Sequence, residues 1–387
     1  MRILHVTKKY PNALGGDAIG SFNLEEKQMK LGHEVFILTT NCNEIIDKPN
    51  VIKFGLKDLT QNWDTVNFKR LFSSLILFFL SFSLIKKIRP DVVHSHSVDL
   101  GFILSFVCKL YKIPIINQCR GVSFPYKQDT SAKRIIEKIC LKYSKFNKIV
   151  TVDKNSLPSF KKANIKNVIY MPNGVDLEKF NKKKTNKGKK IIFLFVGRIE
   201  KQKGLIYLIN AINILKVNNS NFKVHLVGTG TEEEYLKEII LKFNLKKYIK
   251  FFGKKTSQEI TTYYVNSDVF ILPSIWEGFP LTLLEAWAAS LPVIITNVGG
   301  VSKICKNKEN VLMIPSKNSK KIAEVMLELI KNKKLREKLG KNGRKLVEEK
   351  YNWEKVAKKF VSLYKNLKIL KNRNLQPRKK EVLEKNE

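Results

Sequence analysis

Residues 191–204 read IIFLFVGRIEKQKG, an apolar run that ends at a glycine and continues into a basic segment. The run Ile191–Val196 predicts a buried β-strand, and apolar side chains at helical spacing from Leu205 to Leu215 predict a helix directly after it. The same rhythm then repeats, with strands predicted at 223–227, 269–272 and 292–296. Strands that alternate with helices are typical of a parallel sheet covered by helices on both faces.

The first half of the chain follows the same pattern. Strands are predicted at 2–7, 34–39, 92–95, 113–117 and 148–152, separated by segments long enough for crossover helices. Between the two halves, residues 181–190 read NKKKTNKGKK, which has six lysines and no apolar side chain and therefore predicts an exposed linker. We predict an α/β protein of two Rossmann-like domains, 1–182 and 183–354, that face an interdomain cleft, with a helix from about 355–387 packing back on the first.

Composition limits the class of protein. A chain of 387 residues with 43% hydrophobic residues can bury enough apolar surface to fold, which excludes global disorder. The 72 Lys and Arg against 34 Asp and Glu give a net charge of +38, which attracts phosphate, nucleic acid or acidic lipid, or is largely solvated background. The five cysteines form no C-x-x-C pair, which argues against a disulfide framework and a zinc site. The first residues read as a strand and not as a signal peptide, so we expect a cytoplasmic protein.

The segment 71–85, LFSSLILFFLSFSLI, contains no charged residue and has basic residues on both sides. Fifteen residues are fewer than the roughly 17–25 that a spanning helix needs. We expect either a core helix of the first domain or an interfacial helix that attaches the protein peripherally to an anionic membrane surface.

Two cations follow the strand 191–196. Arg198 supplies a fork of donors that matches phosphate oxygens, and Lys203 adds a compact charge just before a helix. The pair suits a pyrophosphate. Taken alone, both residues could equally be surface cations of a basic chain.

A second motif, SIWEGFPLTLLEA at 274–286, combines a predicted strand end, a Gly-Phe-Pro turn and a helix. Glu277 and Glu285 are eight residues apart, and their carboxylates suit vicinal hydroxyls of a sugar. The free N–H groups around Leu281 and Thr282 at the helix start can receive an anion. By itself the spacing is weak, because many helices carry solvated acids in such pairs.

Taken together, these features resemble the retaining GT-B glycosyltransferases of group 1, also called family 4. The resemblance rests on Gly197-Arg198 with Lys203-Gly204, the EGFPLTLLEA element, the strand at 292–296, Gly299-Gly300 and the PNGVD segment at 172–176, and it covers nearly the whole chain. It implies a hexosyl-type transferase that moves a sugar from a nucleotide-sugar, UDP- or GDP-linked, to a glycan or lipid-linked acceptor in cell-surface polysaccharide or lipopolysaccharide biosynthesis.

The resemblance also implies roles for individual residues. Arg198 and Lys203 would neutralise the diphosphate, Glu285 would hold the ribose, and Glu277 and His96 would lie near the transferred sugar. The further donor-binding residues that it implies are Gly15, Gly16, Gly228, Gly253, Lys254, Phe279, Pro280, Leu281 and Thr282. Taken alone, a Gly-Gly pair is more often a turn, and a histidine at a strand end is more often a structural hydrogen-bond partner.

Two positions depart from the family pattern. Arg120-Gly121 stands where many relatives have His-Gly, and Lys303 stands where an acid is usual. We assign Arg120 to binding of the acceptor. The chain contains no D-x-D pair, and Arg198 with Lys203 can stabilise the leaving diphosphate, so we expect no metal and no other cofactor.

Two other functions stay open at this stage. A GT-B epimerase or phosphorylase would use a similar nucleotide site. A nucleic-acid-binding protein would use the +38 charge, but we expect no nucleic-acid partner because the sequence lacks a recognisable binding module.

Overall fold

The structure is a computed structural model. It describes residues 1–8, 16–39, 49–54, 68–120, 124, 132–181, 190–218 and 221–375. The chain divides into two compact units. The first unit comprises Met1–Val150, Ser159–Ile169 and Ala357–Glu387, and the second comprises Thr151–Pro158 and Tyr170–Val356. The chain thus first leaves the first unit at residue 150, whereas the sequence prediction set the boundary at 182.

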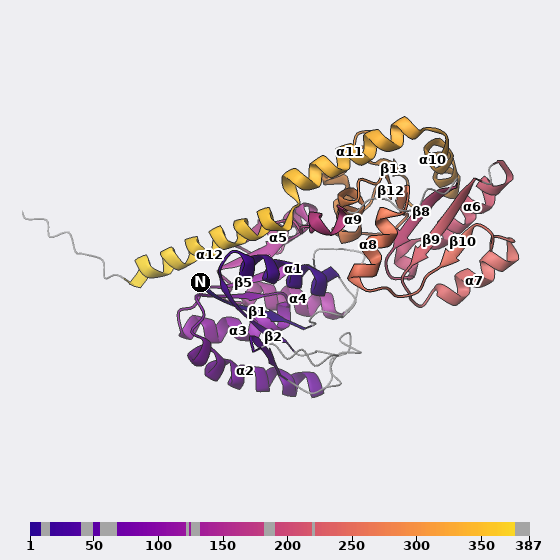
Figure 1. Cartoon of the computed structure of the whole chain (residues 1–387). Coiled ribbons are helices and arrows are strands. Elements are labelled where there is room, and N and C mark those ends of the chain that lie inside the picture. The colour runs from indigo at the N-terminus through magenta and orange to yellow at the C-terminus, as the bar shows by residue number, and fades with distance from the viewer. Residues whose placement is uncertain are drawn as a thin grey trace, which may run out of the picture. The chain divides into compact units, whose positions relative to one another are not determined.

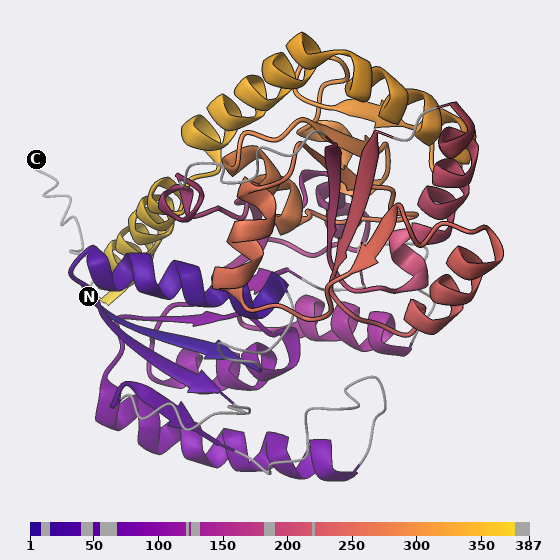
Figure 2. The same ribbon diagram turned by 45° about the vertical axis from the view of Figure 1, so that its right-hand side comes forward.

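A seven-stranded sheet with the order β3-β2-β1-β4-β5-β6-β7 organises the first unit. β1 pairs in parallel with β2 and β4, as β2 does with β3 and β4 with β5. The indigo helix α1 lies on one face of this sheet and the purple helix α2 on the other (Figures 1 and 2). The strands are β1 (Arg2–Thr7), β2 (Glu34–Thr39), β3 (Val51–Lys53), β4 (Val92–Ser95), β5 (Ile115–Cys119), β6 (Lys148–Thr151) and β7 (Val168–Tyr170). The helices are α1 (Gly16–Lys30), α2 (Phe68–Ile88), α3 (Val98–Leu110), α4 (Ala132–Tyr143) and α5 (Leu157–Lys162).

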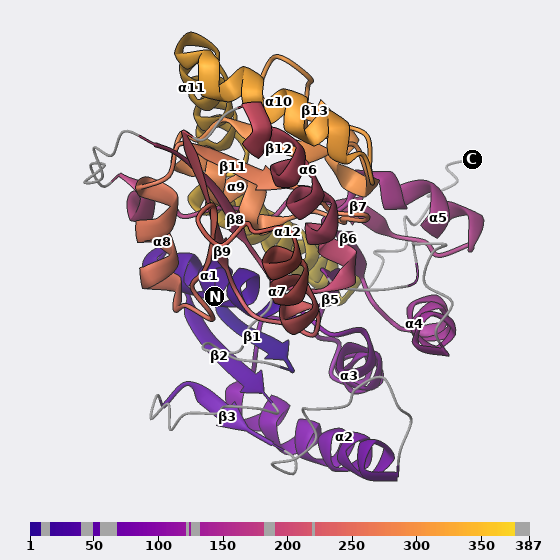
Figure 3. The same ribbon diagram turned by 90° about the vertical axis from the view of Figure 1, so that its right-hand side faces the viewer.

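A six-stranded parallel sheet with the order β10-β9-β8-β11-β12-β13 forms the centre of the second unit. Helices α6 and α7 lie on one face, and α8 and α9 lie on the other (Figures 1 and 3). The strands are β8 (Ile191–Val196), β9 (Phe222–Val227), β10 (Ile249–Phe251), β11 (Val269–Leu272), β12 (Val293–Thr296) and β13 (Leu312–Ile314). The helices are α6 (Leu205–Asn218), α7 (Glu233–Lys242), α8 (Ser257–Val265), α9 (Leu281–Ala288), α10 (Ser319–Lys331) and α11 (Lys333–Lys350).

Helix α12 (Trp353–Leu375) starts in the second unit and continues in the first. Trp353 and Val356 are buried in the second unit, and Tyr364 is fully buried in the first, where it contacts Gln28 and His94. The four 3-10 segments are η1 (Lys154–Ser156), η2 (Leu177–Phe180), η3 (Lys201–Lys203) and η4 (Gly299–Lys303).

The sequence located the long strands correctly and missed the short ones. β1, β2, β4, β8 and β11 have the predicted bounds. The prediction of a strand at 113–117 was wrong by two residues, because Pro114 has no N–H and the ladder begins at Ile115. β3, β7, β10 and β13 have three residues each, which is too short for a recognisable apolar pattern. Of the predicted linker, residues 182–189 lie outside the described residues.

Helix α2 contains the uncharged segment 71–85. Leu77, Ile85 and Ile88 are buried in the core of the first unit, whereas the ring of Phe79 is 70% exposed. Among the helices that the structure describes, none is long and apolar enough to cross a membrane.

Close packing between α9 and α11 fixes one face of the second unit. A Cβ added at Gly343 of α11 would lie 2.1 Å from Cδ1 of Trp287. Trp287 is fully buried, and its indole N–H donates to the carbonyl oxygen of Asn310 at 3.1 Å. The ring therefore cannot yield without losing that hydrogen bond.

We expect Gly343→Ala to destabilise the second unit by about 1–3 kcal/mol, the usual cost of overpacking. Alanine has a higher helix propensity than glycine, by about 1 kcal/mol. An effect of helix propensity alone would therefore stabilise the protein. The free energy of unfolding, measured with urea, distinguishes the two outcomes. Lys341→Ala on the exposed face of α11 is the control, and stabilisation by Gly343→Ala would show that Trp287 yields.

Candidate active site

The carboxyl ends of β8, β9 and β10 meet at one edge of the second sheet. Gly197 donates its N–H to the carbonyl of Val227 at 3.0 Å, and Gly228 donates to the carbonyl of Gly253 at 2.9 Å. Gly228 has a φ of +134°, and a Cβ there would lie 1.9 Å from the carbonyl oxygen of Gly197. Only glycine can be accommodated where the two backbones approach so closely. The approach aligns the ends of three strands at the edge of the sheet where open α/β sheets bind their ligands.

A nearly buried ion pair links the two sequence motifs. Nζ of Lys203, in η3, lies 2.6 Å from Oε1 of Glu277, and their side chains are only 14% and 7% exposed. The hydroxyl of Ser274 donates to the same carboxylate oxygen at 2.7 Å. Glu277 therefore holds Lys203 in a defined position through one of its two carboxylate oxygens.

Backbone and amide hydrogen bonds hold the loop of Glu277 beside η3. Gln202 accepts from the N–H of Ile275 at 2.8 Å through its carbonyl, and its side-chain amide donates to the carbonyl of Trp276 at 2.9 Å. Gly299, with a φ of +55°, packs against the same loop, since a Cβ there would lie 1.7 Å from the carbonyl oxygen of Glu277. Gly299, one of the residues on which the family resemblance rests, thus supports the loop through its close backbone approach.

Glu285, in the second turn of α9, lies beside Tyr264 of α8. The phenol of Tyr264 donates to Oε2 of Glu285 at 2.9 Å and lies 3.3 Å from the carbonyl oxygen of Thr282. Burial raises the pKa of Glu285 above its ordinary value, although the hydrogen bond from Tyr264 and the charge of Lys179 act in the opposite direction. Burial and the neighbouring Glu285 carboxylate also raise the pKa of Tyr264.

The start of α9 has no side-chain cap. Pro280 is its N-cap and supplies no side-chain cap, and the first turn contains no acidic residue. Leu281 and Thr282, at this end, are half-buried. The N-terminus of such a helix attracts an anion through its free N–H groups and its dipole.

Other predicted donor residues lie around these elements. Arg198 and Lys254 are exposed, and among the described residues Arg198 forms no hydrogen bond or ion pair. Phe279 lies with its ring centre 5.7 Å from that of Tyr351. Lys303, at the end of η4, is exposed.

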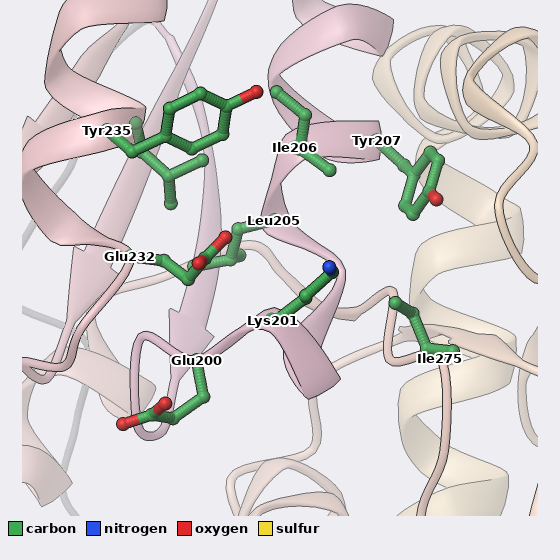
Figure 4. Close-up of a pocket in the computed structure, with 9 residues that line it drawn as sticks. Glu200, Lys201, Leu205, Ile206, Tyr207, Glu232, Tyr235 and Ile275 are labelled. Atoms are coloured by element: carbon green, nitrogen blue, oxygen red, sulfur yellow. The ribbon is translucent and has the colours of Figure 1, made fainter.

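A pocket of about 340 Å³ lies beside the segment that joins β8 to α6 (Figure 4). Acidic and aromatic side chains from this segment, from α6 and from the start of α7 surround it, together with Ile275. None of its lining residues is among the predicted site residues. The lining residues are Glu200, Lys201, Leu205, Ile206, Tyr207, Glu232, Tyr235, Leu236 and Ile275.

In the first unit, His96 follows β4 and hydrogen-bonds to His5 of β1, with 2.8 Å between Nε2 of His96 and Nδ1 of His5. Arg120 follows β5, and its guanidinium lies against α1, since a Cβ at Gly20 would be 2.7 Å from Nη1. Gly16 is the first residue of α1, and Gly15 lies outside the described residues.

Several contacts that position the predicted residues are not evident from the sequence. Tyr264 is 21 residues from Glu285, and Gln202 is 74 residues from Trp276, so no local spacing relates them. Ser274 is an exception, because it lies three residues before Glu277, on the same turn. A hydroxyl at that distance from a carboxylate is a local signal that could have found it.

Two family models match the chain: "Glycosyltransferase Family 4" over residues 14–179 and "Glycosyl transferases group 1" over residues 176–346. The chain belongs to the group 1 glycosyltransferases. It is therefore a transferase enzyme, and the two parallel-sheet units form the GT-B fold.

Similar proteins and solved structures support this family assignment. An uncharacterized glycosyltransferase of Methanocaldococcus jannaschii is 29% identical over 94% of this chain and 98% of its own length. A UDP-Gal:α-D-GlcNAc-diphosphoundecaprenol α-1,3-galactosyltransferase of Escherichia coli is 28% identical over 75% of this chain and 79% of its own length. The sucrose-phosphate synthase of Thermosynechococcus elongatus has the same fold, with a TM-score of 0.82 at 20% identity over 95% of this chain and 99% of that one.

We expect Lys203→Met to lower the free energy of unfolding of this glycosyltransferase by about 3 kcal/mol, because Glu277 then keeps a buried charge without its cation. Adding Glu277→Gln should recover part of that loss, which a double-mutant cycle with urea unfolding measures. Lys201→Met, at an exposed lysine of the same segment, is the matched control. Additive effects of the two substitutions would show that the ion pair contributes nothing.

Proposed function

We propose that this glycosyltransferase moves a sugar from a UDP- or GDP-linked nucleotide-sugar to a glycan or lipid-linked acceptor in cell-surface polysaccharide or lipopolysaccharide biosynthesis. The observation that carries the proposal is the ion pair between Lys203 and Glu277, with the exposed Arg198 five residues before Lys203 on the same segment. It combines two cations for a diphosphate with an acid for sugar hydroxyls. The Escherichia coli relative, whose name includes a UDP-sugar donor and a lipid diphosphate acceptor, supports this class of reaction.

The donor contacts that we propose all belong to the second unit. Arg198, Lys203 and the N–H groups at Leu281 and Thr282 neutralise the diphosphate, with Phe279 and Pro280 shaping the turn before them. Glu285 accepts hydrogen bonds from the ribose, and Tyr264 orients its carboxylate. The turns at Gly228, Gly253 and Lys254 flank the base.

Residues of the first unit complete the proposed assignment. His96 contacts the transferred sugar, Gly15 and Gly16 approach the donor phosphates, and Arg120 contacts an anionic acceptor. Within the second unit, the bond of Glu277 to Lys203 couples the sugar contact proposed for Glu277 to the diphosphate.

We further propose that transfer retains the anomeric configuration and needs no metal. The acceptor hydroxyl attacks the anomeric carbon on the face from which the diphosphate leaves. The bond from that carbon to the diphosphate oxygen breaks, and this oxygen takes the acceptor proton. Arg198 and Lys203 stabilise the negative charge that develops on the leaving group, a role for which a divalent ion is the usual alternative.

Peripheral attachment to an anionic membrane is also proposed. Phe79 of α2 and Leu110 of α3 are 70% and 68% exposed, and these two helices pack together. Lys86, Lys87 and Arg89 are exposed at the end of α2. Exposed apolar side chains beside basic ones suit an interface with acidic headgroups.

We expect Arg198→Ala to lower kcat/KM for sugar transfer by about 10²–10³-fold, as loss of one stabilising donor usually does. Product formation is measured with UDP- and GDP-sugars in the presence of EDTA, and NMR of the product gives its anomeric configuration.

Glu285→Ala should instead weaken binding of the free nucleoside diphosphate, measured by calorimetry.

The control for loss of a basic side chain is Lys216→Ala, at a lysine near the end of α6 that donates to the carbonyl of Phe243 and belongs to none of the proposed donor contacts. Wild-type kcat/KM in Arg198→Ala would contradict the assignment. Interconversion of the nucleotide-sugar without transfer would favour an epimerase.

For the membrane, we expect flotation with vesicles of phosphatidylcholine and phosphatidylglycerol, weakened by salt and by the double variant Phe79→Ser/Leu110→Ser. Val217→Ser changes an equally exposed apolar residue of the second unit, 78% exposed, and is the matched control. Flotation that does not depend on acidic lipid, on salt or on the double variant would exclude this surface.

A further inference from the structure

Three histidines of the first unit lie together where β1 and β4 run side by side. His5 and His94 are fully buried, and His96 is half-buried as a residue although its Nδ1 is buried. The ring centres are 5.0 Å apart for His5 and His94, 5.1 Å for His5 and His96, and 4.2 Å for His94 and His96. One ligand atom from each lies within 4.8 Å of the others, so the group has the composition of a metal site.

The orientation of the rings favours a hydrogen-bonded chain over a metal site. The rings of His5 and His96 are 8° from parallel, with 2.8 Å between Nδ1 of His5 and Nε2 of His96. Two coplanar imidazoles joined end to end by such a bond have their centres about 5 Å apart, as here. The two nitrogens therefore face each other along one line, whereas ligands of a common ion must both face a third point.

The chain continues from His5 to the C-terminal helix. Nε2 of His5 lies 2.7 Å from Oε1 of Gln28 in α1, and Nε2 of Gln28 lies 3.1 Å from the hydroxyl of Tyr364 in α12. That hydroxyl lies 2.6 Å from Nδ1 of His94. Five side chains from four elements thus form one continuous path.

The distances indicate which group donates in each hydrogen bond of this path. O–H donors form shorter hydrogen bonds than N–H donors, so the 2.6 Å contact assigns the single hydrogen of Tyr364 to Nδ1 of His94. Tyr364 must then accept from the amide of Gln28, which turns the oxygen of Gln28 toward His5.

The same reasoning extends to His96. His5 donates its Nε2–H to Gln28 and so presents the lone pair of Nδ1. His96 must then donate its own Nε2–H to His5, which leaves a lone pair on Nδ1 of His96. Among the described residues, this buried nitrogen has no hydrogen-bond partner.

We propose that Tyr364, Gln28 and His5 are positioning residues that fix the tautomer of His96, so that its Nδ1 accepts a hydrogen bond from a substrate hydroxyl. The assignment of that hydroxyl to a sugar rests on the proposed function. The tautomer itself does not, because it follows from the hydrogen bonds of this unit alone.

The charges around the histidines are consistent with neutral rings. Burial lowers the pKa of His5 to about 3, against a hydrogen bond with Gln28 that raises it. Burial also lowers the pKa of His94 and of His96, and the nearby Arg120 guanidinium lowers both further. Glu25 of α1 is the acidic group nearby, with its Oε1 3.9 Å from Nδ1 of His5.

NMR of the ¹⁵N-histidine-labelled protein tests the tautomers directly. We expect His5, His94 and His96 to be neutral and protonated at Nε2 from pH 5 to 8. A proton on Nδ1 of His96, or titration of His96 near pH 6.5, would overturn the proposal. Shifts of all three rings on addition of Zn²⁺ would also overturn it, in favour of a metal site.

The variant Tyr364→Phe removes one hydroxyl and keeps the ring. We expect His96 to populate both tautomers and kcat/KM for transfer to fall about tenfold, with unchanged affinity for the free nucleoside diphosphate. Tyr111→Phe makes the same chemical change elsewhere in the first unit and is the control. An unchanged His96 tautomer in Tyr364→Phe would refute the positioning role even if transfer fell, whereas a wild-type protein without transferase activity would refute the proposed function and leave the tautomer result standing.

Discussion

The contact of Lys203 with Glu277 is the constraint on which the second unit's site depends. It joins the segment after β8 to the loop after β11, which are 74 residues apart in sequence. Ser274 bonds to the same carboxylate oxygen, and Gly299 lies against the backbone of Glu277. Three loops at one sheet edge are therefore fixed around a single acidic side chain, and a shift of any one of them would expose or separate a nearly buried charge pair.

The first unit has, at its polar centre, a path of hydrogen-bonded side chains. Its polar centre consists of imidazoles, an amide and a phenol, each of which can both donate and accept. Such groups satisfy one another in series, so this path costs less than isolated buried polar atoms would. The direction of the path matters because a single hydrogen on Tyr364 determines which nitrogen of every ring carries its proton.

Sequence reasoning succeeded where physical signals are local. Strand β8 is an uninterrupted apolar run before a glycine, and Glu277 lies in a turn marked by Gly278 and Pro280, so both were predicted from neighbouring residues. Tyr264 and Tyr364 could not be found in this way. Each is a tyrosine on an ordinary helix, and its partner is fixed only by the packing of that helix against a distant segment.

The structure shows the ionic partners of several of the chain's basic residues. Lys203 is paired with Glu277 in the structure, whereas Arg198 is exposed and has no ionic partner among the described residues. Other lysines form short-range pairs on helix surfaces, such as Lys237 with Glu233 and Lys321 with Glu324, and solvent screens such exposed pairs. A lysine paired with a glutamate adds no net charge, so the excess of +38 comes from basic residues outside such pairs.

Helix α12 contributes residues to both units. Trp353 and Val356 of its first turn are buried in the second unit, and the residues from Ala357 onward belong to the first. A fragment that ended before this helix would retain every strand of both sheets, yet Gln28 and His94 would lose the phenol that completes their hydrogen bonds. The first unit is therefore discontinuous in sequence, and a ribosome finishes its polar centre only after it has synthesised the whole of the second.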